Sequence, residues 1–343
     1  MFLILRQCGS KFLSRALLRG ARMLEAIVSG LLTFFLAPAA IILGRRLEVV
    51  GVDIHKPWRP IVPKTGGLAI ILGATAGMIL GAHASGFQLF IPVILSCLVA
   101  ASIGLVEDLR EEIDPRLKPL LLIFASLPVL VLGAYSPRPL IPFLGKTRLY
   151  RVYPVLVMAS YPVICNAVNS LDVLNGSALL TSIPFLIMSS VIFYMRGDLQ
   201  LLILSLIFLA AAVAMLPYNM YPARTFIGNS GSLFIGAGIT SIAIMGSIEV
   251  AAIIALMPQI MNEMYVLFSI RGLKSAKNIG RRPVVVENGM LAASEDPDAP
   301  ITLLRMICAG IKVDERRAVY AMALISAFAA FLGFLTHILL LGG

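Results

Sequence analysis

The residues of this 343-residue chain that could carry out chemistry stand in a few short polar clusters. Glu107 and Asp108 are adjacent and could bind a cation or handle a phosphate group. Asn166, Asn169 and Asp172 are spaced three apart, so on a helix they would project from one face. Carboxylate and amide oxygens at these positions are the ligands that Mg²⁺ prefers.

Basic and glycine-rich segments accompany these oxygens. Residues 228–232 read Gly-Asn-Ser-Gly-Ser and precede an apolar stretch, as the start of a helix would. A helix start can bind phosphate through its free backbone N–H groups and the positive end of its dipole. Lys56 and the pair Arg281-Arg282 add positive charge. Together the clusters predict a site for a diphosphate substrate and a hard cation.

Each cluster taken alone also has a simpler interpretation. Glu107-Asp108 could be a solvated helix end. The asparagines could form hydrogen bonds between membrane helices, which such bundles use commonly. Asn229 or Ser230 could do no more than cap a helix. Glu263, inside an otherwise apolar stretch, could pair with a neighbouring helix or support the site.

The elements that must position these residues are membrane-spanning helices. Hydrophobic residues make up 59% of the chain and charged residues 13%, which excludes a soluble enzyme or a nucleic-acid-binding protein. A span needs about 20 apolar residues. Nine stretches carry little or no charge: 26–44, 65–106, 119–137, 152–171, 173–195, 199–223, 225–248, 250–270 and 318–343. The stretch 65–106 is long enough for two spans joined at 83–86, so ten spans are predicted. We therefore expect an all-α, polytopic membrane protein.

The distribution of Lys and Arg predicts the orientation of these spans. If the N-terminus lies outside, the cytoplasmic loops hold 18 Lys or Arg and the opposite loops five. Basic residues concentrate in cytoplasmic loops. All the polar clusters then fall on the cytoplasmic face, with a long cytoplasmic loop at 271–317. Residues 1–22 form a basic extension before a single domain at 23–343.

These residues, in this order, resemble the polyprenyl-phosphate N-acetylhexosamine-1-phosphate transferases, the glycosyltransferase family 4 type. The resemblance runs from about residue 25 to the end and rests on motifs such as Asn-Ala-Val-Asn at 166–169 and Gly-Asn-Ser-Gly at 228–231. It is nearest to the dolichyl-phosphate GlcNAc-phosphotransferase branch of eukaryotes and archaea, to which 221–224, Tyr-Pro-Ala-Arg, also points.

The resemblance implies an activity and its partners. Such enzymes transfer a sugar-1-phosphate, here GlcNAc-1-phosphate, from a UDP-sugar to a polyprenyl or dolichyl phosphate and release UMP, as the first step of lipid-linked glycan assembly. It further implies ten transmembrane helices, a cytoplasmic active site, Mg²⁺ or Mn²⁺ as cofactor and a homodimer. The protein would lie in the cell membrane, or in the endoplasmic reticulum membrane of a eukaryote.

The resemblance also implies roles for individual residues. Asn169 and Asn229 match metal-binding positions, and Asp108, Glu107 and Lys56 match catalytic ones. Seven further positions are candidates for substrate binding, either because they match substrate-binding residues or because the chemistry above assigns them to the substrate phosphates. They are Asp172, Asn175, Lys118, Arg281, Arg282, Gly228 and Ser230.

The sequence departs from the family pattern at three places. Glu107 stands for the first residue of an Asp-Asp pair, and Asn229 replaces the aspartate of a Gly-Asp-Thr metal turn. The loop 271–317 contains no histidine, although many relatives carry one there. These departures leave a second interpretation, a non-catalytic relative that binds lipid phosphate or nucleotide-sugar, or that pairs with an active homologue. A third, an unrelated transporter, would predict matching repeats in the two halves, which the polar clusters do not show.

Overall fold

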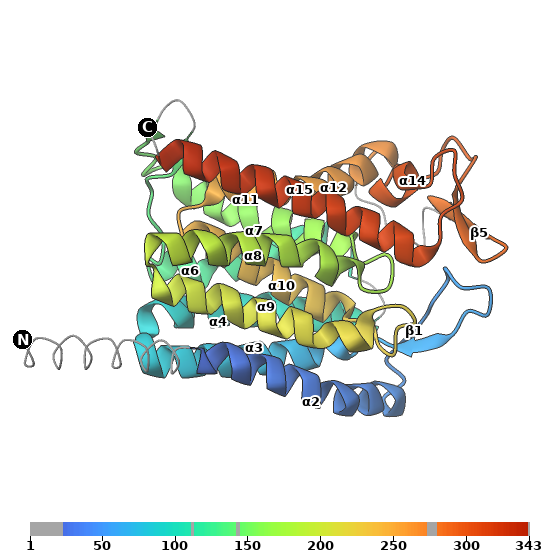
Figure 1. Ribbon diagram of the computed structural model, residues 1–343, viewed down its shortest axis with the longest axis horizontal. Coiled ribbons are helices and arrows are strands. Elements are labelled where there is room, and N and C mark those ends of the chain that lie inside the picture. The colour runs from blue at the N-terminus through green and yellow to red at the C-terminus, as the bar shows by residue number, and fades with distance from the viewer. Residues whose placement is uncertain (1–22, 111–112, 142–144, 273–279, 342–343) are drawn as a thin grey trace, which may run out of the picture.

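The computed structural model describes residues 23–110, 113–141, 145–272 and 280–341. The long helices lie side by side in one bundle, and short hairpins stand at its ends (Figure 1). The helices of the bundle are α2 (Leu24–Arg46), α3 (Gly66–Ser85), α4 (Phe87–Arg110), α5 (Leu117–Ile123), η1 (Phe124–Ser126), α6 (Leu127–Val131), α7 (Tyr153–Ser170), α8 (Ser177–Arg196), α9 (Leu199–Asn219), α10 (Gly228–Met245), α11 (Glu249–Ala255), α12 (Met257–Ser269) and α15 (Glu315–Leu341).

The prediction of an all-α membrane protein is confirmed. Seven helices of the described residues are long and apolar enough to span a membrane, and α11 with α12, bent by 64°, would make an eighth. The predicted junction within 65–106 is also correct, since α3 ends at Ser85 and Gly86 turns the chain with φ +107°. The segment 117–131 is only a short apolar helix interrupted by η1, and α7 contains asparagines and prolines. A count of ten spans stays a prediction.

Helix α10 forms the centre of the bundle and fixes the position of the polar clusters. It packs against α4, α7 and α3, and 83% of its 18 residues are buried. Glycines permit the close approach: a Cβ added at Gly104 of α4 would lie 2.5 Å from the backbone carbonyl carbon of Asn229. The end of α4 is therefore held against the first turn of α10.

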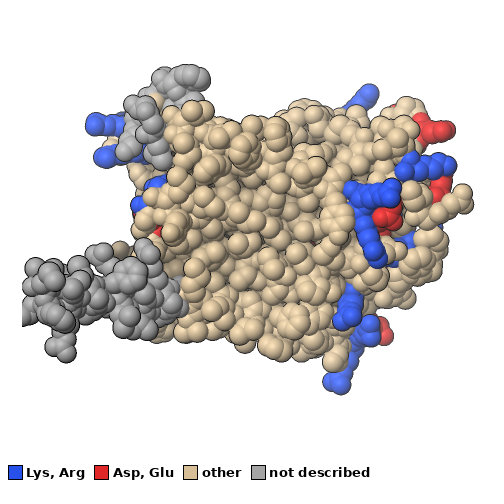
Figure 2. Space-filling model, in the orientation of Figure 1, with Lys and Arg blue, Asp and Glu red and all other residues tan. Residues whose placement is uncertain are grey.

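The polar clusters gather at one end of the bundle. The chain reverses there between α4 and α5, between α7 and α8, and between α9 and α10, and α15 begins there (Figure 1). The hairpin of β1 (Val50–Val52) and β2 (Ile61–Pro63) closes the same end. Lys and Arg side chains also gather at this end, while the sides of the molecule carry almost none in the view of Figure 2. His83 lies in the last turn of α3, at the opposite end.

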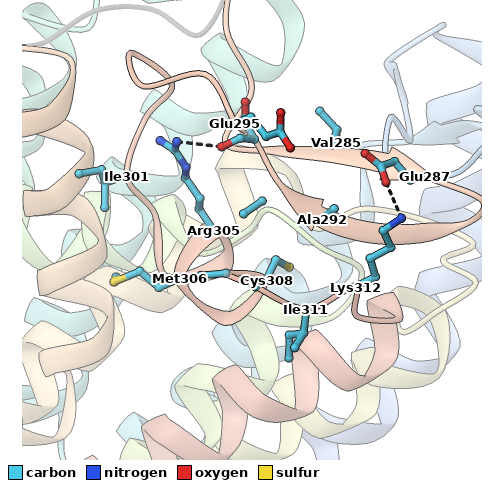
Figure 3. A pocket seen from close by; sticks show the side chains of 14 residues that line it. Val285, Glu287, Ala292, Glu295, Ile301, Arg305, Met306, Cys308, Ile311 and Lys312 are labelled. Atoms are coloured by element: carbon cyan, nitrogen blue, oxygen red, sulfur yellow. Dashed lines mark hydrogen bonds and ion pairs between the residues drawn. The ribbon is translucent and has the colours of Figure 1, made fainter.

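The loop 271–317, as far as it is described, forms a small cap on that end. It contains the hairpin of β5 (Val284–Glu287) and β6 (Met290–Ala293) and the short helix α14 (Leu303–Ile307). Its apolar side chains, such as Leu291 and Leu304, pack with Leu171 and Leu174 of the loop between α7 and α8. Between the hairpin and α14 lies an open cavity of about 780 Å³ (Figure 3). The sequence pattern predicted none of these elements. The predicted extension 1–22 lies outside the described residues.

Candidate active site

The carboxylate of Asp108 holds the first turn of α10. Its Oδ1 accepts hydrogen bonds from the backbone N–H of Asn229 (2.9 Å) and from the side-chain Nδ2 of the same residue (3.1 Å). Its Oδ2 accepts the backbone N–H of Ser230 (2.9 Å). Asp108 is 6% exposed. Gly228 adopts φ +67°, and a Cβ there would lie 2.7 Å from Asp108 Oδ2, so only glycine fits beside the carboxylate.

This arrangement differs from the expected phosphate site. The helix start at 228–230 was expected to offer free N–H groups to a substrate phosphate. Two of them, from Asn229 and Ser230, are donated to Asp108 instead. An anionic carboxylate at a helix N-terminus is favoured by the helix dipole, as a phosphate would be. Asp108 therefore occupies the position that the sequence assigned to the substrate.

Lys118 connects Asn229 to Glu107. The Lys118 ammonium lies 2.8 Å from Glu107 Oε2 and donates to Asn229 Oδ1 at 3.3 Å. The amide of Asn229 thus accepts from the lysine through its oxygen and donates to Asp108 through its nitrogen. The side chains of Glu107, Asp108, Lys118 and Asn229 form one connected polar network, which we call the α10 cluster.

Asn169 and Asp172 stand next to this cluster. The Ser232 hydroxyl, one turn into α10, donates to Asn169 Oδ1 at 2.7 Å. Burial and, after it, the negative charge of nearby Asp108 together raise the pKa of Asp172 to about 7. The two acids therefore repel each other, and a bound cation would relieve this repulsion. The expected convergence of 107–108, 118, 169, 172 and 229 is present.

The oxygens of the α10 cluster, together with those of Asn169 and Asp172 beside it, suit a hard cation. They are carboxylate and amide oxygens, and the described residues contain no group of three His, Cys, Asp or Glu side chains placed to hold a metal alone. Mg²⁺ commonly uses one or two carboxylates, keeps several waters and takes substrate phosphates as further ligands. Asp108 and Asp172 with the amide oxygens of Asn169 and Asn229 fit that mode of binding, in which the substrate completes the site.

Lys56 lies in a second polar group. It is 2% exposed, forms an ion pair with Asp53 and lies 3.2 Å from Glu315 Oε2. Its ammonium also stands 4.8 Å from the centre of the Tyr221 ring. The family resemblance gives Lys56 a catalytic role together with Glu107 and Asp108, whereas its contacts join it to the start of α15. Asn175 belongs to the same group, because its backbone N–H donates to Glu315 Oε1 at 3.2 Å.

The two loop arginines have separate surroundings. Arg281 forms ion pairs with Asp296 and Asp298 on the exposed surface, so both of its described partners belong to its own loop. Arg282 is exposed and stands within electrostatic range of His55. The pKa of His55 is lowered to about 4, because the effect of burial, which Lys56 and Arg282 reinforce, outweighs the opposing effect of Asp53. The structure does not place the side chains of Arg281 and Arg282 around one common binding position.

Two acids extend the list of residues near the site. Glu263 of α12 faces the Ser170 hydroxyl and the charge of Lys118, which fits both interpretations given to it. Glu315 was missed entirely. Its partner Lys56 is 259 residues away in the chain, so no local spacing could reveal it. The ion pair of Lys56 with Asp53, in contrast, could have been predicted from the i, i+3 spacing of these two residues.

Known proteins resemble this chain in sequence over the region that carries these residues. The model of the glycosyl transferase family 4 matches residues 90–247, which include the whole of the α10 cluster. A UDP-N-acetylglucosamine–dolichyl-phosphate N-acetylglucosaminephosphotransferase of Saccharolobus solfataricus is 32% identical over 250 residues, 70% of this chain and 76% of the relative. An undecaprenyl-phosphate N-acetylglucosaminyl 1-phosphate transferase of Bacillus subtilis is 28% identical over 66% of this chain and 64% of the relative. A phospho-N-acetylmuramoyl-pentapeptide-transferase of Clostridium novyi is 28% identical over 62% and 68%.

Proposed function

This chain belongs to glycosyl transferase family 4, and on that premise we propose that the α10 cluster is the place where its two substrates react. The protein is a membrane enzyme that transfers a sugar-1-phosphate from a UDP-sugar to a polyprenyl phosphate. An oxygen of the lipid phosphate forms a bond to the phosphorus that carries the sugar. The bond from that phosphorus to UMP breaks, and UMP leaves with the electron pair.

The observation that carries the proposal is the connected network of the α10 cluster at one end of the bundle. It contains two carboxylates and one ammonium, so with Lys118 and Glu107 paired at 2.8 Å the charge of Asp108 remains. Such a site repels two polyanionic substrates unless a cation joins it. Phosphoryl transfer depends mainly on positioning the phosphates and neutralising their charge.

We include Mg²⁺, or Mn²⁺ in its place, as the cofactor of this site. Asp108 and Asp172, with the amide oxygens of Asn169 and Asn229, would hold it. When bound, the ion offsets the charge of the diphosphate and of the departing UMP. Lys118 provides the positive charge that belongs to the protein itself. Its pairing with Glu107 keeps the ammonium at the cluster, where it can turn toward a phosphate.

The remaining substrate assignments are also part of the proposal. The sugar is GlcNAc, and the lipid is a dolichyl or related polyprenyl phosphate, because two of the relatives named above, those of Saccharolobus solfataricus and Bacillus subtilis, are named for these compounds. Asn175 faces the nucleotide, since its Nδ2 is buried without a hydrogen-bond partner among the described residues. The protein forms a homodimer in the cell membrane, or in the endoplasmic reticulum membrane of a eukaryote, as the family resemblance implies.

The test is UMP release by the purified protein in detergent with polyprenyl phosphate. We expect release with UDP-GlcNAc and Mg²⁺ and at least about tenfold slower release with UDP-glucose. Chelation with EDTA should abolish release, and an excess of Mg²⁺ should restore it. Release that is insensitive to chelation would contradict the metal assignment. Equal rates with both sugars would contradict the assignment of GlcNAc and leave the transfer itself in place.

A further inference from the structure

The group around Glu315 joins three segments that are distant in the sequence. Glu315 opens α15, is 4% exposed, and accepts from Lys56 Nζ and from the backbone N–H of Asn175. Lys56 lies in the loop between β1 and β2, and Asn175 in the loop between α7 and α8. One buried carboxylate thus ties both loops to the last helix. We call Asp53, Lys56, Glu315 and Asn175 the α15 clamp.

The charges of the clamp bear on what Lys56 can do. Its ammonium is buried between two carboxylates, those of Asp53 and Glu315, so the three groups together carry one net negative charge. A lysine in this position must break both ion pairs to reach a phosphate, and each carboxylate would then stay buried without its cation. Leaving one partner of a buried pair uncompensated is strongly destabilising.

The clamp acts on Asn175 in a specific way. Its backbone N–H is fixed by Glu315 at 3.2 Å, whereas its side-chain Nδ2 is buried without a partner in the described structure. Gly176 follows with φ +84°, and Ser177 Oγ donates to the carbonyl of Leu174 at 2.8 Å. The loop is thereby held rigidly, and the amide of Asn175 keeps its hydrogen-bonding capacity for a ligand.

We propose that Glu315 is a positioning residue for the UDP-sugar and that Lys56 serves to neutralise the clamp and does not bind phosphate. This inference rests on the proposed function, since it concerns the nucleotide-sugar of that reaction. Glu315 holds Asn175, and with it the loop that carries Asp172, in the geometry that receives the substrate. Because α15 begins at Glu315, within the predicted loop 271–317, the same contact fixes where the loop ends in the structure.

Epistasis between Lys56 and Glu315 provides the test. Lys56→Met leaves two buried carboxylates without a cation, and we expect the KM for UDP-GlcNAc to rise at least about tenfold with a smaller change in kcat. Adding Glu315→Gln removes one of those charges while the Gln oxygen still accepts from Asn175. The double variant should therefore recover at least about threefold of the loss in kcat/KM. A lysine that binds phosphate would allow no such recovery.

Further variants separate positioning from folding. Glu315→Gln alone should change KM less than about fivefold, because the Asn175 contact survives, and Glu315→Leu should raise it at least about tenfold. Glu287→Gln, which removes an exposed acid paired with Lys312 on the same end, is the matched control and should leave KM unchanged. Thermal unfolding and gel filtration in detergent establish that each variant compared is folded. If Glu315→Leu does not fold, the comparison of Lys56→Met with the double variant still tests whether Lys56 neutralises the clamp.

The two proposals fail in different ways. A native protein that releases no UMP from UDP-GlcNAc contradicts the proposed function, whatever the variants do. A native protein that is active, with a double variant no better than Lys56→Met, contradicts the role given to Glu315 and returns Lys56 to the phosphates. Recovery in the double variant, together with the difference between Glu315→Gln and Glu315→Leu, supports the clamp.

Discussion

At the scale of single residues, Asp108 has two functions that one substitution would affect together. Asp108→Asn removes the charge and replaces one of the two carboxylate oxygens by an NH₂ group. A single amide oxygen then faces the three N–H donors that the carboxylate accepts from. We expect UMP release to fall at least about 100-fold. Stability should also fall by about 1–3 kcal/mol, because N–H groups lose a buried acceptor. UMP release and thermal unfolding measure the two effects.

The control for this prediction is Asp114→Asn. Asp114 is an exposed acid in the connection that follows α4, and its Oδ1 accepts only the N–H of Arg116 among the contacts of the described residues. It should leave activity within about twofold of the native value. Retained activity in Asp108→Asn would transfer the charge requirement to Glu107 or Asp172.

Asn229 is the residue where this chain departs most from its family, and its contacts sharpen the expected result of Asn229→Asp. The new carboxylate would stand about 3 Å from Asp108 Oδ1, where Nδ2 now lies at 3.1 Å. Without a cation this like-charge pair should lower stability, and with Mg²⁺ it should bind the ion more tightly by about 1–3 kcal/mol. We predict a variant that is stabilised by Mg²⁺ more than the native protein and needs less Mg²⁺ for half-maximal activity.

Thermal unfolding and UMP release across a Mg²⁺ titration check this prediction. The side chain of Asn229 contacts Asp108 and Lys118 and does not cap α10. If Asn229 does not face the metal, the curves of activity against Mg²⁺ should coincide for the native protein and the variant. Coincident curves in an active protein would place the metal at Asp108 and Asp172 alone.

Residue types and spacing predicted much of the α10 cluster but not the α15 clamp. Glu107-Asp108, Asn169 and Asn229 are each recognisable by type and by their place at a helix end. Lys56 was recognised but its partner Glu315 was not, because Glu315 begins a helix 259 residues later and has no motif around it. The occupation of the α10 N–H groups by Asp108 was equally hidden, since it depends on how closely α4 and α10 approach.

At the scale of elements, the packing of α4 on α10 creates the site. A Cβ at Gly104 would lie 2.5 Å from backbone atoms of Asn229 and Ser230, which cannot move aside as a flexible side chain could. Gly104→Ala should push the start of α10 away from Asp108, destabilise the protein by about 1–3 kcal/mol and reduce UMP release at least about tenfold. Thermal unfolding and UMP release measure both changes.

Gly30→Ala is the matched control for this packing. A Cβ at Gly30 of α2 would lie 3.4 Å from the Ala210 methyl group of α9, at the edge of ordinary contact. It should be tolerated with little loss of stability or activity. Equal effects of the two substitutions would mean that the α4–α10 contact has no special connection with the site.

The helices themselves were predictable because charge is so costly in lipid that its absence marks the spans. The break between α3 and α4 at Gly86 was predicted at the correct residues. Two other breaks were not predicted, the 64° bend between α11 and α12 and the interruption of 117–131 by η1. Both occur within apolar stretches, where no charge marks a boundary. The β5–β6 hairpin was not predicted, although Asn288-Gly289, where both residues have positive φ, is a sequence signal for a two-residue hairpin turn.

At the scale of the whole molecule, the charge asymmetry predicts which end faces the cytoplasm. The starts of α10 and α15 and the strand β5 lie at one end of the bundle (Figure 1). Arg282 precedes β5 by two residues, and His83 lies in the last turn of α3, at the other end. Cysteines introduced at 282 and 83 should react from the cytoplasmic and the outer side respectively. Cys97, Cys165 and Cys308 are buried, so a background with Cys8 replaced by Ser gives clean labelling. Labelling of position 282 from outside only would overturn the cytoplasmic site.

The central claim is that this protein moves a sugar together with its phosphate and releases UMP. Purified protein with polyprenyl phosphate, Mg²⁺ and UDP-GlcNAc labelled in both the sugar (¹⁴C) and the β-phosphate (³²P) tests it directly. We predict that both labels enter the lipid phase in equal amounts and that UMP appears in the aqueous phase at the same rate. Transfer of the sugar label alone, with UDP as the aqueous product, or no transfer by a folded protein that binds UDP-GlcNAc, would contradict the account.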